Sequence, residues 1–184
     1  MIFGAQPRFE IFSISTLFIG CPSGLVSSHI IRPSYPVLSA IKLANSLNLP
    51  MFLHQRDAHK EFMICLSTET PKINCVVHCF TGNKKELFEY LDKNFYIGLT
   101  GWVCDPKRGA HLEELIPLIP LNRLLIETDS PYLLPKNLKV KGRRNEPSFL
   151  IEILKKIIKE RSESENEIIE MLSKNSFCFF NIQQ

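Results

Sequence analysis

Three side chains that can bind metal ions stand at the ends of short apolar runs. His54 follows the run MFL, His78 follows CVV, and Asp129 comes three residues after LLI. Each run is apolar throughout and bounded by turn residues, which is typical of a strand buried on both faces. Imidazole and carboxylate groups together suit divalent cations such as zinc, manganese or magnesium. If these strand ends meet, they could bind one or two such cations.

Each of these residues also has an ordinary structural explanation. A single histidine at the end of a strand is more often packed and hydrogen-bonded in a core than bound to metal, and Asp129 could simply cap the turn before Pro131. However, Glu127 and Asp129 put two carboxylates at the end of a buried strand, where they are costly unless paired or bound to a metal. The combination of two histidines and this acidic turn therefore favours a metal site.

Alternating strands and helices are expected to position these residues. The expected strands are 51–54, 75–78, 95–99 and 124–126. The expected helices are 36–47, 57–65, 84–91, 110–116, 148–159 and a last one that begins at Ser162, with Glu165 completing its capping box. A strand and a helix recur about every 20 to 30 residues, which predicts an α/β fold with a parallel sheet. The carboxyl ends of parallel strands share one edge, so the histidines and Asp129 should meet there.

Composition sets broad limits on the protein. A chain of 184 residues suits one domain, and 45% hydrophobic with 22% charged residues is ordinary for a globular protein. The net charge of +3 is too small to imply nucleic-acid binding by itself and only permits an anionic substrate. The six cysteines contain no Cys-x-x-Cys pair, which predicts reduced thiols in a cytoplasmic protein and not a disulfide framework.

The first 34 residues differ from the rest of the chain. The apolar stretch 11–20 is too short to span a bilayer and lies too far from a basic region to predict a signal peptide, so no membrane partner is expected. His29 has no partner at ligand spacing. We therefore expect 1–34 to be a separate, divergent segment and 35–184 to be the domain that carries the chemistry; the oligomeric state is left open.

Five strings of the sequence resemble the TatD family of metal-dependent deoxyribonucleases. They are FLHQRDAH, VVHCFTG, YIGLTGWVCDPKRG, LLIETDSPYLLP and RRNEP, and they begin at positions 52, 76, 96, 124 and 143. Their order and spacing agree with the family, and the end of the chain after Asn175 fits its asparagine-then-phenylalanine ending. The resemblance implies the C-terminal part, about four βα units, of a TIM-type (β/α)8 barrel.

The resemblance also implies a function. It suggests a hydrolase that cleaves phosphodiester bonds of DNA with a divalent cation, most readily Mg²⁺, with Mn²⁺ or Zn²⁺ as alternatives. Members of the family include 3′–5′ exonucleases of single-stranded DNA and RNA, so single-stranded DNA, and RNA beside it, are the implied substrates. His54 and His78 match the family's metal-binding histidines, and Asp129 matches the aspartate that binds metal or acts as the catalytic base.

Other matched residues fall into supporting roles. Glu127 is expected to support the loop of Asp129 without binding the metal itself, and Asn145 with Glu146 to tie the following basic loop to the ETDSP turn. Arg56 could contact a phosphate or pair with its neighbour Asp57. These roles follow from the resemblance and from residue type, not from spacing alone.

Two further features concern the substrate. Arg144 lies in a basic loop, where it could contact the phosphate backbone or simply be solvated. Trp102 and Tyr132 could stack on a base, although packing is an equally good explanation for both.

The chain departs from the family at its start. The family's His-x-His strand and its later Glu-x-Gly-x-Asp strand have no counterpart before Tyr35, and Glu10 is the single acidic residue in that part. One alternative is therefore a catalytically impaired remnant that binds metal or nucleic acid weakly, or pairs with another chain. A metal-dependent hydrolase of small substrates is another, against which the GWVCD and RNEP strings argue.

Overall fold

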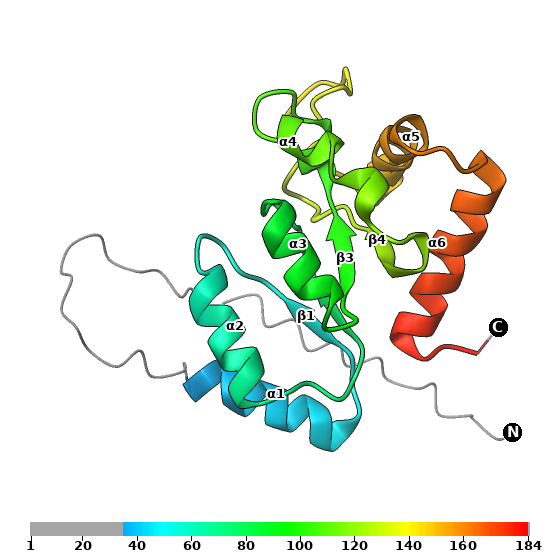
Figure 1. The fold of residues 1–184 in the computed structure, drawn as a ribbon. Helices are drawn as coiled ribbons and strands as arrows, with labels where there is room; N and C mark the ends of the chain where they lie inside the picture. Colours follow the sequence, from blue (N-terminus) through cyan, green and yellow to red (C-terminus); the bar gives the residue numbers. More distant parts are fainter. Residues whose placement is uncertain (1–34, 184) are drawn as a thin grey trace, which may run out of the picture.

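The computed structural model describes residues 35–183, in which a four-stranded sheet is surrounded by helices (Figure 1). The predictions made for 1–34, including those on stretch 11–20, Glu10 and His29, lie outside the described residues. The helices are α1 Tyr35–Leu47, α2 His59–Thr68, α3 Lys84–Leu91, α4 Ala110–Glu113, α5 Leu150–Glu160 and α6 Glu165–Phe180. The strands are β1 Met51–Leu53, β2 Cys75–Val77, β3 Tyr96–Leu99 and β4 Leu124–Ile126. None of the described helices is long and apolar enough to cross a membrane.

The sheet is parallel throughout, with the strand order β1-β2-β3-β4. Each strand is followed by helical structure before the next strand begins, so the predicted α/β alternation is confirmed. β1 and β4 form the two edges, and no further strand within residues 35–183 pairs with either. The carboxyl ends of all four strands consequently lie along one edge of the sheet.

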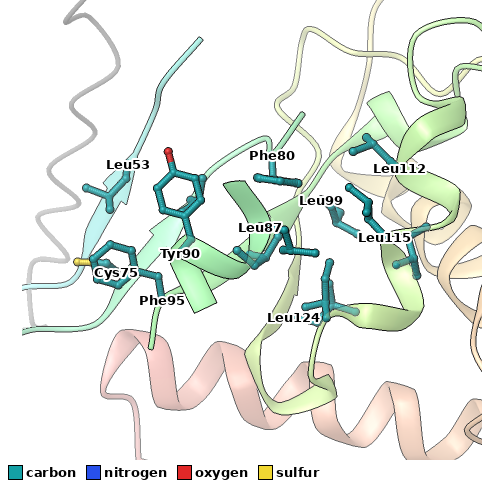
Figure 2. Packing of buried hydrophobic residues seen from close by; sticks show 14 of the residues in the cluster. Leu53, Cys75, Phe80, Leu87, Tyr90, Phe95, Leu99, Leu112, Leu115 and Leu124 are labelled. Atoms are coloured by element: carbon teal, nitrogen blue, oxygen red, sulfur yellow. The ribbon is translucent and has the colours of Figure 1, made fainter. Parts of the chain in front are cut away.

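One face of the sheet packs against the helices and forms the main core. Strand residues such as Leu53, Leu99 and Leu124 meet Leu87 and Tyr90 of α3 in this cluster (Figure 2). All five are buried almost completely. Each fully buried side chain of this kind stabilises the fold by about 1.5–3 kcal/mol, so this face supplies most of the driving force that holds the sheet together.

The opposite face carries a smaller aromatic cluster. Phe52 of β1 and Tyr96 of β3 contact Phe179 near the end of α6, with ring centroids 5.4 and 5.6 Å apart and nearly perpendicular planes. Phe180 lies beside Phe179 in the same edge-to-face arrangement. Perpendicular packing of this kind is favourable for aromatic rings. The end of α6 therefore covers part of this face of the sheet.

Asn175 fixes α6 to the start of β4, and the two elements lie side by side in Figure 1. Its side-chain Nδ2 donates hydrogen bonds to the carbonyl oxygens of Leu121 and Leu124, both at 2.8 Å, and the residue is buried. A buried amide that satisfies two carbonyls is costly to remove. This contact gives the asparagine of the sequence resemblance a structural role.

The prediction that the last helix begins at Ser162 was wrong. The helix begins at Glu165, and its N-cap is Ser164, which accepts a hydrogen bond from the backbone N–H of Glu167. The preceding turn is held by Arg161, whose guanidinium pairs with Glu163 and donates to two backbone carbonyls. Those contacts keep residues 162 and 163 outside the helix.

Other helix boundaries also moved. The helix expected at 57–65 begins at His59, because Asp57 adopts a left-handed backbone with φ of +54°. The helix expected at 110–116 ends at Glu113 and continues as a 3₁₀ turn at Ile116–Leu118. The helix expected at 148–159 is preceded by a 3₁₀ turn and begins at Leu150. The elements themselves were predicted correctly.

The described cysteines are free thiols. Four of them, Cys65, Cys75, Cys79 and Cys104, are buried, and Cys178 is exposed. Burial raises the pKa of Cys75 to about 12 and that of Cys104 to about 11. These thiols keep their protons at neutral pH and behave as small apolar core residues.

The buried Cys75 thiol makes a testable contribution to pH-dependent stability. Its pKa is about 12 in the folded chain and about 9 when exposed, so its contribution is complete below pH 9 and is lost as the pH rises toward 12. Cys75→Ala should make the decline of the unfolding free energy above pH 9 shallower by up to about 1.4 kcal/mol per pH unit. Urea denaturation between pH 7 and 10.5 measures this slope.

The matched control is Cys178→Ala, which removes an exposed thiol. The unfolding free energy of this variant should decline above pH 9 as steeply as that of the parent chain. A Cys75→Ala variant with the same slope as the parent would contradict the account.

Candidate metal centre

The C-terminal edge of the sheet brings the predicted ligands together. His54 directly follows β1, His78 directly follows β2, and Asp129 lies three residues beyond β4. His78 Nε2 is 3.6 Å from Asp129 Oδ1, and the ring centroids of His54 and His78 are 5.7 Å apart. Two histidines and a carboxylate from three separate strands therefore occupy one small region.

Glu127 holds the other side of the His78 ring. His78 Nδ1 is hydrogen-bonded to Oε2 of Glu127, which leaves Nε2 facing Asp129. A carboxylate at one ring nitrogen fixes the tautomer and orientation of a histidine whose other nitrogen binds a cation. This is the contact expected of a residue that supports a metal ligand from behind.

The two carboxylates also control the charge of His78. Burial alone would lower its pKa, but the hydrogen bonds and negative charges of Asp129 and Glu127 outweigh burial and raise the pKa of His78 to about 10. A pKa raised in this way favours the protonated imidazolium form of His78 at neutral pH when no cation is bound. A proton on Nε2 and a cation bound to Nε2 exclude each other, so the two carboxylates create a place for one positive charge of either kind.

His54 differs from His78 in the direction of its pKa shift. It is exposed, and partial burial together with the positive charges of His78 and Arg56 lowers its pKa. A neutral imidazole has a free lone pair at neutral pH, which is the form that binds metals. The surroundings thus shift the pKa values of the two histidines in opposite directions.

The side chains at this edge are of the types that bind a divalent cation, but fewer of them converge than one cation needs. Ligand atoms at about 2.0–2.1 Å from a tetrahedral cation lie about 3.4 Å apart, close to the His78–Asp129 separation of 3.6 Å. Glu127 Oε1 and Ser130 Oγ are buried there and have no hydrogen-bond partner among the described residues. Within residues 35–183, however, no three His, Cys, Asp or Glu side chains are grouped to hold one metal ion. Two donors converge, and His54 stands outside them.

The loop that carries Asp129 has an unusual backbone. Asp129 and Leu133 both adopt left-handed conformations, with φ of +57° and +54°. Such conformations are unfavourable for residues other than glycine unless the surroundings enforce them. Asn145 supplies that enforcement, because its buried side-chain Nδ2 donates to the carbonyl oxygens of Thr128 at 2.6 Å and Tyr132 at 2.8 Å.

The backbone around Asn145 completes the connection. The N–H of Asn145 donates to the carbonyl of Pro131 at 3.0 Å, and the N–H of Glu146 donates to Oδ1 of Asn145 at 2.9 Å. The side chain of Glu146 is itself exposed. Asn145 therefore makes the loop contact expected of it, Glu146 contributes through its backbone, and their importance for catalysis stays a prediction.

Two glycines that sequence reasoning missed make room for this site. A Cβ atom on Gly98 would lie 2.7 Å from Cδ of Glu127, and one on Gly101 would collide with the backbone carbonyl oxygen of Leu133. Both glycines therefore allow the acidic loop to approach β3 closely. Their only signal in the sequence is the string GLTG, which does not reveal what approaches it.

The string GWVCDPKRG folds around Asp105. The Asp105 carboxylate accepts hydrogen bonds from Nε of Arg108 and from the backbone N–H groups of Arg108 and Lys107, and these contacts lower its pKa to about 2. The Arg108 guanidinium lies 4.3 Å from the centroid of the Trp102 ring, and the Trp102 Nε1–H donates to the carbonyl of Arg108 at 3.2 Å. This turn holds Trp102 next to the C-terminal end of β3.

The two predicted substrate-binding arginines are both exposed. The Arg56 guanidinium lies 5.7 Å from the centroid of the Trp102 ring, and no ion pair joins it to Asp57 or to another described residue. The alternative that Arg56 pairs with Asp57 is therefore not seen. Arg144 lies in the basic loop, and its contact with phosphate stays a prediction.

The remaining described histidines are bound elsewhere. His59 contacts the hydroxyl of Tyr90 at 2.9 Å and the carboxylate of Glu89 at 2.6 Å. His111 Nε2 is 3.0 Å from the carbonyl oxygen of Thr81. Neither belongs to the group at the edge of the sheet, as expected from the sequence.

A parallel α/β sheet with histidines and carboxylates at its C-terminal edge is the arrangement typical of barrel-type metal-dependent hydrolases. Residues 37–181 match the family described as TatD related DNase, and the chain belongs to this family. The four strands are part of its TIM-type (β/α)8 barrel, as predicted.

Known relatives support this membership. The chain is 46% identical over 145 residues to the 3′-5′ ssDNA/RNA exonuclease TatD of Citrobacter rodentium, covering 77% of this chain and 55% of that protein. A crystal structure of a TatD homologue from Escherichia coli K12 matches with a TM-score of 0.70 at 28% identity, over 78% of this chain and 54% of the other. A TatD family hydrolase from Entamoeba histolytica matches with a TM-score of 0.68 at 27% identity, over 77% and 54%. The chain spans about half the length of these relatives.

Removal of the Asn145 side chain is expected to destabilise the protein. Asn145→Ala would remove a buried side chain whose hydrogen bonds hold the carbonyls of Thr128 and Tyr132, and it should lower the free energy of unfolding by about 1–3 kcal/mol. Asn137→Ala, which removes an exposed hydrogen bond to Glu152, should change it by less than about 0.5 kcal/mol. Urea denaturation of both variants measures the difference, and equal effects would show that Asn145 does not hold the loop.

Proposed function

We propose that the chain is a divalent-metal-dependent nuclease that hydrolyses phosphodiester bonds of single-stranded DNA, and of RNA beside it, from the 3′ end. The observation that carries this proposal is the His78 ring held between Glu127 and Asp129 at the C-terminal edge of the sheet. The relative from Citrobacter rodentium, a 3′-5′ ssDNA/RNA exonuclease by name, supports the substrate class and the direction.

His78 Nε2 and Asp129 would hold the cation, with His54 as a further ligand from the neighbouring strand. Mg²⁺ is the proposed ion, with Mn²⁺ or Zn²⁺ as alternatives. When bound, such a cation supplies Lewis-acid chemistry that activates water and offsets charge on the phosphate. Asp129 is also the carboxylate that would accept the proton of the attacking water.

The surrounding residues have supporting roles in this proposal. Glu127 keeps the His78 ring oriented, and Asn145 with the backbone of Glu146 holds the Asp129 loop in place. Arg56 and Arg144 would contact substrate phosphates. Such contacts give sequence-independent affinity that falls as salt rises.

We also propose a cytoplasmic location and assign the catalytic domain to residues 35–184. The buried free thiols support a reducing compartment, and the family match over 37–181 supports the domain boundary.

One observation favours a second candidate function. Because no three metal-binding side chains are grouped within the described residues, the chain could bind nucleic acid and a cation weakly without catalysing hydrolysis. In that case its affinity for single-stranded DNA would remain and no product would form.

Release of nucleotides from a 5′-labelled single-stranded oligonucleotide tests the proposal. With Mg²⁺ or Mn²⁺ the full chain should shorten the oligonucleotide from its 3′ end, and Asp129→Asn should reduce the rate by at least about 100-fold because the proton acceptor is lost. His78→Ala should abolish the activity. His111→Ala removes a histidine outside the site and should keep the parent rate.

The two candidate functions give different results in this assay. Shortening that persists unchanged in His78→Ala would contradict the nuclease proposal. Binding of the oligonucleotide by a folded parent chain without any shortening would establish the second candidate.

A further inference from the structure

Trp102 is the single tryptophan of the chain and lies at the same edge of the sheet as the candidate metal centre. It belongs to the 3₁₀ turn Gly101–Cys104, which directly follows β3 and Thr100. Its side chain is half-buried: part of it packs against the main core cluster, and the rest is accessible. Because part of the indole is accessible beside the candidate site, packing accounts for only part of its position.

The indole is fixed before any ligand binds. Its Nε1–H donates to the carbonyl of Arg108, whose guanidinium lies 4.3 Å from the ring centroid. Asp105 in turn holds Arg108 through Nε at 2.8 Å. A side chain that is already oriented loses little conformational entropy when a ligand stacks on it, so this arrangement favours binding.

Arg56 is the other cation near the ring, and it is held much less tightly. Its guanidinium lies 5.7 Å from the ring centroid, the side chain is exposed, and no acidic partner is found among the described residues. An exposed cation–π contact is weaker than the stacking of a base on an aromatic side chain. A base could therefore displace Arg56 from the ring.

We propose that Trp102 is a stacking platform for a nucleobase of the single-stranded substrate, and that Arg56 binds a phosphate of the same stretch of nucleotides. This inference rests on the proposed nuclease function. Arg56 follows the candidate ligand His54 by two residues, so one short segment links the metal centre to the platform. Bases in a duplex are already stacked and paired, so a stacking platform selects for single strands without selecting for sequence.

Tyr132 is the weaker candidate for this role. It is 71% exposed and has no ring contact with another described residue, so its orientation would have to be fixed by the ligand. Trp102 is pinned by Arg108 and needs no such ordering.

Because Trp102 is the single tryptophan, its emission reports directly on the platform. The test uses the full chain with EDTA, so that no cleavage occurs, and two oligomers of equal length: oligothymidylate and an abasic oligomer with the same phosphates. Anisotropy of labelled oligomers measures binding, and unlabelled oligomers are used for emission. Oligothymidylate should quench Trp102, and the abasic oligomer should bind more weakly and leave the emission nearly unchanged.

Variants distinguish base stacking on Trp102 from a purely structural role of this residue. Trp102→Leu should weaken oligothymidylate binding by about 5- to 150-fold and leave binding of the abasic oligomer unchanged, whereas Trp102→Phe should recover part of the loss. Arg56→Gln should weaken the binding of both oligomers to the same extent. Lys174→Gln removes the same charge from an exposed position on α6 and should change neither.

The outcomes distinguish this inference from the proposed function. Two results would refute the role of Trp102 as a stacking platform and leave the nuclease proposal standing. One is binding of both oligomers without quenching by oligothymidylate, and the other is an equal loss of affinity for both oligomers in Trp102→Leu. Failure of the parent chain to bind either oligomer would refute the proposed substrate and the platform with it.

Discussion

The hydrogen bond between His78 and Glu127 is the interaction on which the candidate site depends. It fixes the imidazole so that Nε2 faces Asp129, and it requires a glycine at position 98 because a Cβ there would collide with the glutamate. The bond also sets the charge of the site, because two carboxylates around one ring stabilise either a proton or a cation between them. The two carboxylates at this strand end, whose burial is costly without a partner, thus both contact the His78 ring.

The second constraint is the loop that presents Asp129. Its left-handed backbone persists because Asn145, from beyond the basic loop, donates to carbonyl oxygens on both sides of the turn. Asn175 acts in a similar way at the other end of β4, where it ties α6 to the strand. Buried asparagines therefore hold β4 and its acidic turn at both ends, and the position of Asp129 in the candidate site depends on them.

The strands, their parallel arrangement and the approach of His78 to Asp129 were predictable, because short apolar runs that end in polar residues leave few alternatives in a parallel sheet. The prediction that His54 joins them at one cation remains untested. The start of the last helix was not predictable. The side chain of Arg161 pairs with Glu163 and donates to the carbonyl of Ile116, and these contacts hold residues 162 and 163 outside the helix. The role of Gly98 was also hidden, since it depends on a glutamate from a strand that is distant in sequence. Such long-range contacts leave no periodic signal.

The measurement that tests the central claim most directly is paramagnetic broadening of histidine ring signals by Mn²⁺ in NMR spectra of the full chain. If His78 and Asp129 share a cation, substoichiometric Mn²⁺ should broaden the ring signals of His78 first and those of His54 next. Binding of the cation should also release the proton from Nε2 of His78. His59 and His111 serve as internal references, because their rings are bound elsewhere. Broadening of all described histidines alike, or none at His78, would contradict the account.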